Sequence, residues 1–179
     1  MTSSDQTALP PGAEAAVAAR VGASHAGDAD AAGGARLAVA CARFNGGITV
    51  RLLDGFLAGL EASGVQPGAV TVAWVPGAFE LPLVAQRLAA RKADVVVALG
   101  AVIRGDTAHF DFVAGQCAAG LQRVAVDLGV PVVFGVLTTD TVEQALERSG
   151  PGPTNKGFEA ARTALEMVNL LAGLPGPAR

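Results

Sequence analysis

Apolar residues along the chain follow two spacings, and each spacing predicts a different element. Short continuous apolar runs, many of them rich in valine, are typical of strands buried on both faces of a sheet. We expect four strands, at residues 36–42, 70–75, 94–103 and 131–137. Apolar residues that recur at helical spacing predict helices between and after these runs. We expect those helices at residues 48–63, 81–91, 109–127, 142–148 and 157–171.

Helices separate the successive strands, and this alternation predicts the fold class. Strands joined by helical crossovers run parallel, and right-handed crossovers place helices on both faces of the sheet. We therefore expect an α/β protein, a three-layer α/β/α sandwich with a four-stranded parallel flavodoxin-like sheet. Ligands of such sheets bind at the carboxyl ends of the strands. Polar and aromatic residues that follow the strands are therefore the candidates for a functional site.

Residues 1–34 have a different composition, dominated by alanine, glycine, serine, aspartate and proline. We expect them to form a flexible tail, in which residues 13–21 form at most a transient helix. The tail lacks the basic start and long apolar block of a secretory signal, and its acidic residues argue against a transit peptide. We expect the folded domain at residues 35–174 and a disordered C-terminus at residues 175–179.

The charge balance and the cysteines narrow the classes of function. The net charge is −3 with scattered lysine and arginine, so we expect no nucleic-acid partner. No apolar run is long enough to span a bilayer, so we expect no membrane partner. Cys41 and Cys117 lie in apolar segments without the spacing of a redox pair or a metal knuckle. We expect both to be buried in a cytoplasmic protein that has no metal site.

The turn after the third predicted strand carries the strongest candidate chemistry. It contains Gly105, Asp106, Thr107 and His109, directly before a predicted helix. Glycine allows close backbone approach, and the free N–H groups of a helix N-terminus attract anions, which together favour a phosphate site. Histidine would add a proton-transfer group, and the other histidine, His25, falls in the tail. The alternative is that Asp106 or Thr107 only caps the helix.

Aromatic and charged residues follow the other strands, and each has two interpretations. Phe44 either packs on the following helix or stacks on a flat ligand ring. Glu80, which follows Phe79, either binds a ligand or interacts with the dipole of its helix. Arg148 and Lys156 flank a segment rich in glycine and proline, where charges are ordinarily solvated. The chain contains no dinucleotide fingerprint and no phosphate-binding P-loop.

The folded part also carries a series of distinctive motifs. They are Arg43-Phe44-Asn45, Val75-Pro76-Gly77-Ala78-Phe79-Glu80-Leu81-Pro82, Gly100-Ala101-Val102-Ile103-Arg104-Gly105, Thr107-Ala108-His109-Phe110, Phe134-Gly135-Val136-Leu137-Thr138-Thr139 and Asn155-Lys156-Gly157. In this order and spacing they resemble the 6,7-dimethyl-8-ribityllumazine synthases, the enzymes of the penultimate step of riboflavin biosynthesis. The resemblance runs from about residue 36 to residue 171.

The resemblance implies a transferase. Such an enzyme condenses 5-amino-6-(D-ribitylamino)uracil with 3,4-dihydroxy-2-butanone 4-phosphate to 6,7-dimethyl-8-ribityllumazine, and it releases phosphate and water. The resemblance implies no metal and no other cofactor. It also implies a homo-oligomer, a ring of five subunits that in some members closes into an icosahedral shell. Riboflavin synthase is the candidate protein partner.

The resemblance further implies roles for individual residues. Phe44 matches the ring that stacks on the pyrimidine, and His109 matches the proton-transfer residue. Asp106 and Thr107 match the phosphate-binding turn, and we expect the backbone of Asp106 to face the phosphate because its carboxylate would repel it. The other pocket residues are Ala78, Phe79 and Glu80, at the uracil and ribityl site, and Ala101, Val102 and Ile103, whose backbone would bind the pyrimidine.

Three more residues resemble groups that complete the site. Phe134 and Arg148 match residues that reach it from a neighbouring subunit, where Arg148 contacts the phosphate. Lys156 matches a charged residue lining the same pocket. In the family, the link between the last two helices controls shell formation, and residues 149–155 have the length found in shell formers. Pro151 and Pro153 could instead misdirect the final helix.

Two other classes of function remain open at this point. A carrier of the same fold would bind a flavin or lumazine ring without turnover, although it would not need Thr107, His109 and Arg148. A structural shell protein would keep the assembly with weak catalysis. Formation of lumazine from both substrates, followed by absorbance, distinguishes these classes.

Overall fold

A parallel sheet forms the centre of the molecule. The computed structural model describes residues 9–29, 34–66, 68 and 70–175. Its strands are β1 (Leu37–Ala42), β2 (Val70–Val75), β3 (Val95–Ile103) and β4 (Val132–Thr139). They pair in the order β2-β1-β3-β4, and every pair is parallel. This order is the one found in flavodoxin-like sheets, as predicted.

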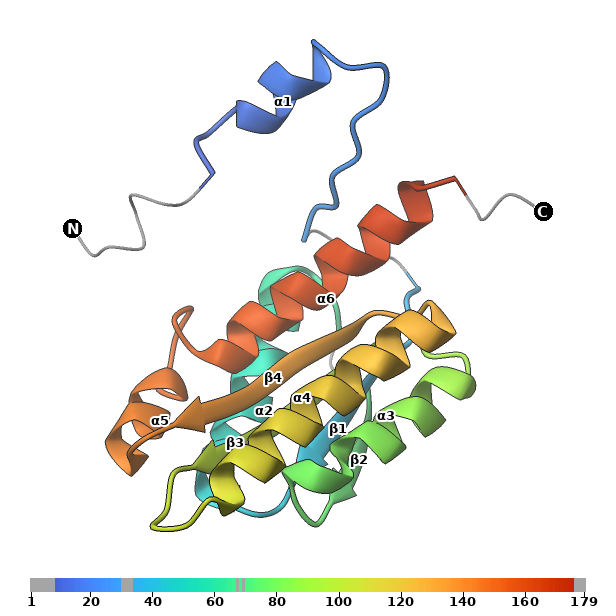
Figure 1. Cartoon of the computed structure of the whole chain (residues 1–179). Coiled ribbons are helices and arrows are strands. Elements are labelled where there is room, and N and C mark those ends of the chain that lie inside the picture. The colour runs from blue at the N-terminus through green and yellow to red at the C-terminus, as the bar shows by residue number, and fades with distance from the viewer. Residues whose placement is uncertain (1–8, 30–33, 67, 69, 176–179) are drawn as a thin grey trace.

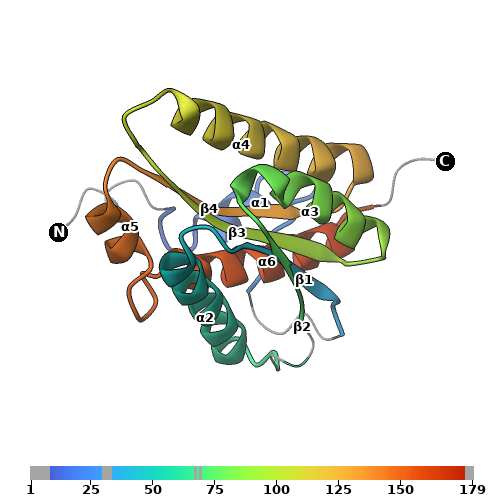
Figure 2. The same ribbon diagram turned by 90° about the horizontal axis from the view of Figure 1, so that it is seen from below.

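Helices cover both faces of this sheet (Figure 1). α2 (Gly46–Ala62) and α6 (Lys156–Gly173) pack on one face, and α3 (Leu81–Ala90) and α4 (His109–Leu128) pack on the other. Figure 2, seen from below, separates the two helix layers with the sheet between them. The shorter elements are α1 (Ala13–Ala18), the 3₁₀ turn η2 (Ala78–Glu80) and α5 (Val142–Arg148). The three-layer α/β/α sandwich is therefore confirmed.

Side-chain alternation along the strands produces two hydrophobic cores. In β1, the odd-numbered residues 37, 39 and 41 join the core under α2 and α6. The even-numbered residues 38, 40 and 42, all alanine, join the core under α3 and α4. Successive side chains of a strand point to opposite faces, so a strand covered on both sides must be apolar throughout. This explains the continuous apolar run of β3, in which only Ile103, the last residue, is incompletely buried.

α2 and α6 pack closely, and their contact fixes the start of α6. Gly157 lies against the carbonyl group of Leu52, where no Cβ would fit. The buried Asn155 caps α6, because its Oδ1 accepts from the Gly157 N–H at 2.7 Å. Its Nδ2 donates to the carbonyl groups of Arg51 at 3.1 Å and Gly150 at 2.7 Å. These bonds hold the loop between α5 and α6, so its two prolines do not displace the final helix.

The predicted boundaries of the four strands and of the five helices that follow the tail agree with the structure to within two residues at every end. β4 continues through Thr138 and Thr139, which pair with Val102 and Ile103 of β3. The predicted strand ends at residue 137, before these polar residues, but the ladder with β3 keeps them in the sheet.

Part of the predicted tail lies within the described residues. α1 forms there, as a short helix with no buried residue. In a later part of the tail, the carbonyl oxygen and a carboxylate oxygen of Asp28 both accept from Asn169 Nδ2 of α6, each at 2.9 Å. Residues 1–8 and 30–33 of the predicted tail, and residues 176–179 of the predicted disordered C-terminus, lie outside the described residues.

Candidate active site

A pocket of about 690 Å³ lies where β1, β2 and β3 end, beside the first turns of α4. We refer to it as the strand-end pocket. Its lining residues are Phe44, Asn45, Pro76, Gly77, Ala78, Phe79, Glu80, Ala101, Val102, Ile103, Gly105, Thr107, His109, Phe110, Phe112 and Val113. Segments far apart in the sequence meet here because parallel strands place all their carboxyl ends at one edge.

Most of the predicted site residues line this pocket together. They are Phe44, Ala78, Phe79, Glu80, Ala101, Val102, Ile103, Thr107 and His109. Asp106 differs from them: it is exposed and does not line the pocket, although Gly105 and Thr107 on either side of it do. The Asp106 side chain is thus not part of the cavity wall.

Three phenylalanine rings at the pocket are open to solvent. The exposed fractions are 71% for Phe44, 58% for Phe79 and 68% for Phe112. A ring that only stapled α2 would be buried against that helix, so the exposure of Phe44 favours the stacking interpretation. Sequence reasoning missed Phe112, because an apolar residue in a helix is ordinarily assigned to its buried stripe.

Two polar side chains hold the backbone at the pocket. Asn45 adopts the left-handed conformation, with φ at 57°, and its Nδ2 donates to the Ala101 carbonyl at 2.9 Å. This bond ties the β1–α2 turn to the end of β3. Glu80 Oε2 accepts from the Gly77 N–H at 3.0 Å, so this carboxylate braces its own turn at the pocket wall. Asn45 was not among the predicted site residues, although asparagine tolerates left-handed backbone and here lies three residues after the end of β1.

The N-terminus of α4 is weakly capped. Its cap residue, Ala108, offers no side-chain hydrogen bond, and Thr107 Oγ1 accepts from the His109 N–H at the long distance of 3.4 Å. The interpretation of this turn as a helix cap alone therefore has little support. The positive end of the α4 dipole lies at the pocket wall beside His109, which is an arrangement suited to an anion.

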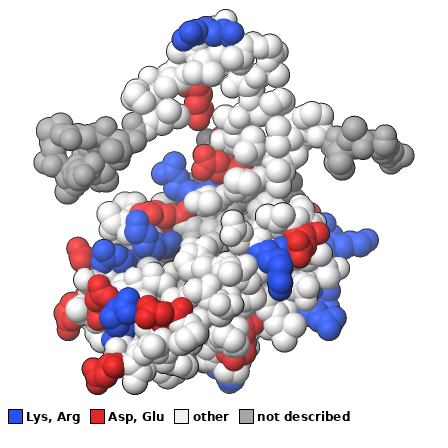
Figure 3. All heavy atoms as spheres, viewed as in Figure 1, with Lys and Arg blue, Asp and Glu red and all other residues white. Residues whose placement is uncertain are grey.

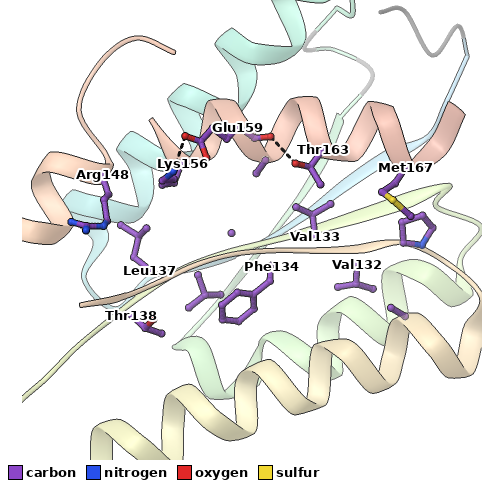
Figure 4. Close-up of a pocket in the computed structure, with 15 residues that line it drawn as sticks. Val132, Val133, Phe134, Leu137, Thr138, Arg148, Lys156, Glu159, Thr163 and Met167 are labelled. Carbon is purple, nitrogen blue, oxygen red and sulfur yellow. Dashed lines mark hydrogen bonds and ion pairs between the residues drawn. The ribbon is translucent and has the colours of Figure 1, made fainter. Parts of the chain in front are cut away.

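The remaining predicted site residues lie in a different cavity. Phe134, Arg148 and Lys156 line a groove of about 630 Å³ along β4 and α6, which we refer to as the β4 groove. Figure 4 shows Arg148 and Lys156 toward one end of this groove and Met167 at the other. Arg148 donates to the Gln144 carbonyl at 3.0 Å, and Lys156 Nζ is 2.7 Å from both carboxylate oxygens of Glu159. His109 does not line the β4 groove, so within this chain the predicted site residues other than Asp106 lie in two separate cavities.

The distribution of charged residues, potential metal ligands and cysteines narrows the possible functions little. On the face shown in Figure 3, acidic and basic side chains are interspersed rather than gathered by sign. Among the described residues, no cluster of three His, Cys, Asp or Glu side chains could hold a metal ion. Cys41 and Cys117 are free thiols, and burial raises the pKa of each to about 11. No helix in the described part of the chain combines the length and apolarity needed to cross a membrane.

The strand order and the pocket at the carboxyl edge define the class of protein: a flavodoxin-like α/β protein with a cavity at its strand ends. The chain belongs to the 6,7-dimethyl-8-ribityllumazine synthase family, whose model matches residues 34–172. This match begins at the end of the predicted tail and includes every predicted site residue.

Curated relatives agree with this assignment. The chain is 54% identical over 144 residues to the 6,7-dimethyl-8-ribityllumazine synthase of Yersinia pestis (strain Pestoides F), covering 79% of this chain and 92% of that protein. The same figures hold for the enzyme of that name from Yersinia pseudotuberculosis serotype O:1b (strain IP 31758). The resemblance seen in the motifs is confirmed, and with it the predicted transferase activity, the formation of 6,7-dimethyl-8-ribityllumazine.

Proposed function

We propose that the strand-end pocket condenses 5-amino-6-(D-ribitylamino)uracil with 3,4-dihydroxy-2-butanone 4-phosphate and releases phosphate and water. The observation that carries this proposal is the convergence of Phe44, the 78–80 turn, the end of β3 and His109 on one cavity. Its volume, about 690 Å³, lies within the range of pockets that enclose small organic ligands. The family assignment supplies the reaction, and the convergence supports this pocket as its location.

The chemistry needs proton transfer and a held phosphate. The uracil amine attacks the ketone to give an imine with loss of a first water, phosphate is eliminated, and ring closure with loss of a second water gives the product. His109 exchanges the protons of these steps, because histidine both accepts and donates near neutral pH. Thr107 and the backbone of Asp106, at the α4 N-terminus, hold the phosphate. Much of the acceleration comes from holding two reactants together.

The pyrimidine occupies the opposite side of the pocket. Phe44 stacks on its ring, and the backbone of Ala101, Val102 and Ile103 binds its edge. Ala78, Phe79 and Glu80 line the space for the uracil and its ribityl chain. The exposure of Phe44 and Phe79 supports these roles, since a ring reserved for a ligand is uncovered when the ligand is absent.

A neighbouring subunit completes the site. Phe134, Arg148 and Lys156 line the β4 groove and not the strand-end pocket, which supports their use in the pocket of an adjacent copy. Arg148 then contacts the phosphate through a charge-assisted hydrogen bond, and Phe134 covers the ring from the other side. Lys156 supplies a further charge. The functional unit is accordingly a homo-oligomer with sites at its subunit boundaries.

We propose a ring of five that assembles further into an icosahedral shell. The loop at residues 149–155 is short, and Asn155 anchors it to α2, which supports the shell over a free pentamer. Light scattering at micromolar concentration and neutral pH tests this assembly. Particles no larger than one pentamer would contradict the shell.

The domain bounds, the cellular location and the protein partner form the last part of this proposal. We propose that the catalytic domain spans residues 35–174, between a tail and a short C-terminus, which the family match at 34–172 supports. The two free, buried thiols support a cytoplasmic location. Riboflavin synthase, which consumes the product, is the candidate protein partner.

Co-expression of two impaired variants tests the shared site. His109→Ala removes the group in the strand-end pocket, and Arg148→Ala removes the group in the β4 groove. If each site combines both cavities from adjacent subunits, mixed rings restore about a quarter of the sites to the native pair. Lumazine formation with both substrates, followed by absorbance, measures the recovery.

The matched control co-expresses His109→Ala with the His109→Ala/Arg148→Ala double variant, in which no native pair can form. Recovery no greater than in this control would contradict a shared site. Binding of both substrates by the unmodified protein without product formation would contradict the enzyme and favour a carrier.

A further inference from the structure

Arg104 joins three elements at the carboxyl edge of the sheet. Its backbone N–H donates to the Thr139 carbonyl at 2.9 Å, at the end of β4. Its Nε donates to Asp140 Oδ1 at 2.8 Å, and its terminal nitrogen donates to Asp111 Oδ1 in the first turn of α4 at 3.2 Å. The guanidinium carbon also lies 4.0 Å from the centre of the Phe110 ring. One side chain thus bridges the end of β3, the end of β4 and the start of α4.

The segment enclosed by these contacts is the turn that carries the predicted phosphate and proton-transfer groups. Residues 104–108 connect β3 to α4, and the weak bond between Thr107 and the His109 N–H is a poor local restraint. Asp140 is a firm anchor, because its own N–H donates to Gln144 Oε1 at 2.9 Å at the start of α5. Figure 1 shows the β3–α4 loop and the tip of β4 at the same end of the sheet.

We propose that Arg104 is a positioning residue that fixes the first turn of α4 against the strand ends. It thereby holds His109 and the phosphate-binding turn in register with the pyrimidine side of the pocket. A guanidinium suits this task, because its planar fork can donate to two carboxylates from fixed directions. The hydrogen bond to Asp140, followed by that to Asp111, raises the pKa of Arg104, so the charge is present throughout the working pH range. This role rests on the proposed function of the pocket.

The solvent exposure of the Arg104 ion pairs distinguishes a role in positioning the turn from a role in stabilising the fold. The side chains of Arg104, Asp111 and Asp140 are 45%, 63% and 67% exposed, and ion pairs at such positions contribute little to folding. The pyrimidine side has its own restraint, the hydrogen bond from Asn45 to the Ala101 carbonyl. Loss of Arg104 should therefore disturb the phosphate side of the pocket and spare the pyrimidine side.

The test compares Arg104→Gln with the matched control Arg36→Gln. Arg36 forms a partly exposed ion pair with Asp94 at the opposite end of the sheet, where the two side chains are 58% and 36% exposed. We expect Arg104→Gln to lower kcat about tenfold, less than the ~100-fold that a 1 Å misplacement can cost. The KM for the butanone phosphate should rise, while the KM for the uracil stays within about twofold. Arg36→Gln should change none of these three constants.

We refer to the contacts of Arg104 with Asp111 and Asp140 as the Arg104 clamp. Three further variants distinguish loss of this clamp from a general defect of the folded protein. Asp111→Asn should reproduce part of the loss of kcat. Adding it to Arg104→Gln should lower kcat little further, because both substitutions remove the same interaction between Arg104 and Asp111. Arg104→Lys should rescue part of kcat, since it keeps the charge without the fork. If Arg104→Gln failed to fold, Asp111→Asn and Arg104→Lys would still test the clamp.

Amide hydrogen exchange provides a readout that does not depend on activity. We expect faster exchange at residues 107–112 in Arg104→Gln and no change there in Arg36→Gln. Unchanged exchange together with unchanged constants would overturn the clamp, and so would an equal rise of both KM values. If the unmodified enzyme made no lumazine, the proposed function would fail, while the exchange measurement would still decide whether Arg104 orders the turn.

Discussion

Replacement of Phe44 by alanine should weaken binding of the uracil substrate far more than it weakens the fold. A phenylalanine side chain carries roughly 200 Å² of surface, and 71% of Phe44 is exposed. A planar ring stacked on one face would cover about half of that exposed area, on the order of 70 Å². At ~25 cal/mol/Å² this contributes about 1.8 kcal/mol.

The aromatic pairing adds about 0.5–1.5 kcal/mol beyond area burial. The sum predicts a loss of about 2–3 kcal/mol, or roughly 30- to 150-fold in the dissociation constant of a product analogue. The free energy of unfolding should fall by less than about 1 kcal/mol, because little of the ring is buried in the protein. Calorimetric titration and urea denaturation measure the two quantities separately.

Two variants make this comparison specific. Phe44→Leu keeps apolar bulk without the flat ring and should lie between the parent and Phe44→Ala. Val50→Ala removes an exposed apolar group of α2 that does not line the pocket, and it should leave affinity unchanged. If Phe44→Ala kept full affinity but lost about 2 kcal/mol of stability, Phe44 would be a helix staple and the stacking argument would be refuted.

Four other predictions follow from the structure. Arg148→Ala should weaken butanone phosphate binding roughly 10- to 100-fold and uracil binding little, and an equal loss for both would contradict the assignment. His109→Ala should slow lumazine formation by about 10²–10⁴ without abolishing it, whereas an unchanged rate would exclude His109 as the proton-transfer group. Asn155→Ala should lower the free energy of unfolding by about 2–4 kcal/mol in urea titrations, since a buried cap and two further hydrogen bonds are lost. Because burial raises the pKa of Cys41 and Cys117 to about 11, iodoacetamide at pH 8 should label both only after unfolding, and rapid native labelling would contradict their burial.

The sequence alone determined the architecture, because its signals are local. A strand buried on both faces must be apolar at every position, and a helix on one face must repeat its apolar residues at helical spacing. These requirements are visible in β3 and α2 without any knowledge of their partners. The strand–helix alternation then restricted the topology and placed the candidate residues at one edge of the sheet.

Only the tertiary structure decided which candidates share a cavity. Phe134 lies on a predicted strand like Ala101, yet it lines the β4 groove because β4 is the edge strand next to α6. The bond between Asn45 and Ala101 spans 56 residues, and the bond between Arg104 and Asp140 spans 36. Strand order and register set such distances, and both depend on the packing of the whole chain rather than on the periodicity of any one segment.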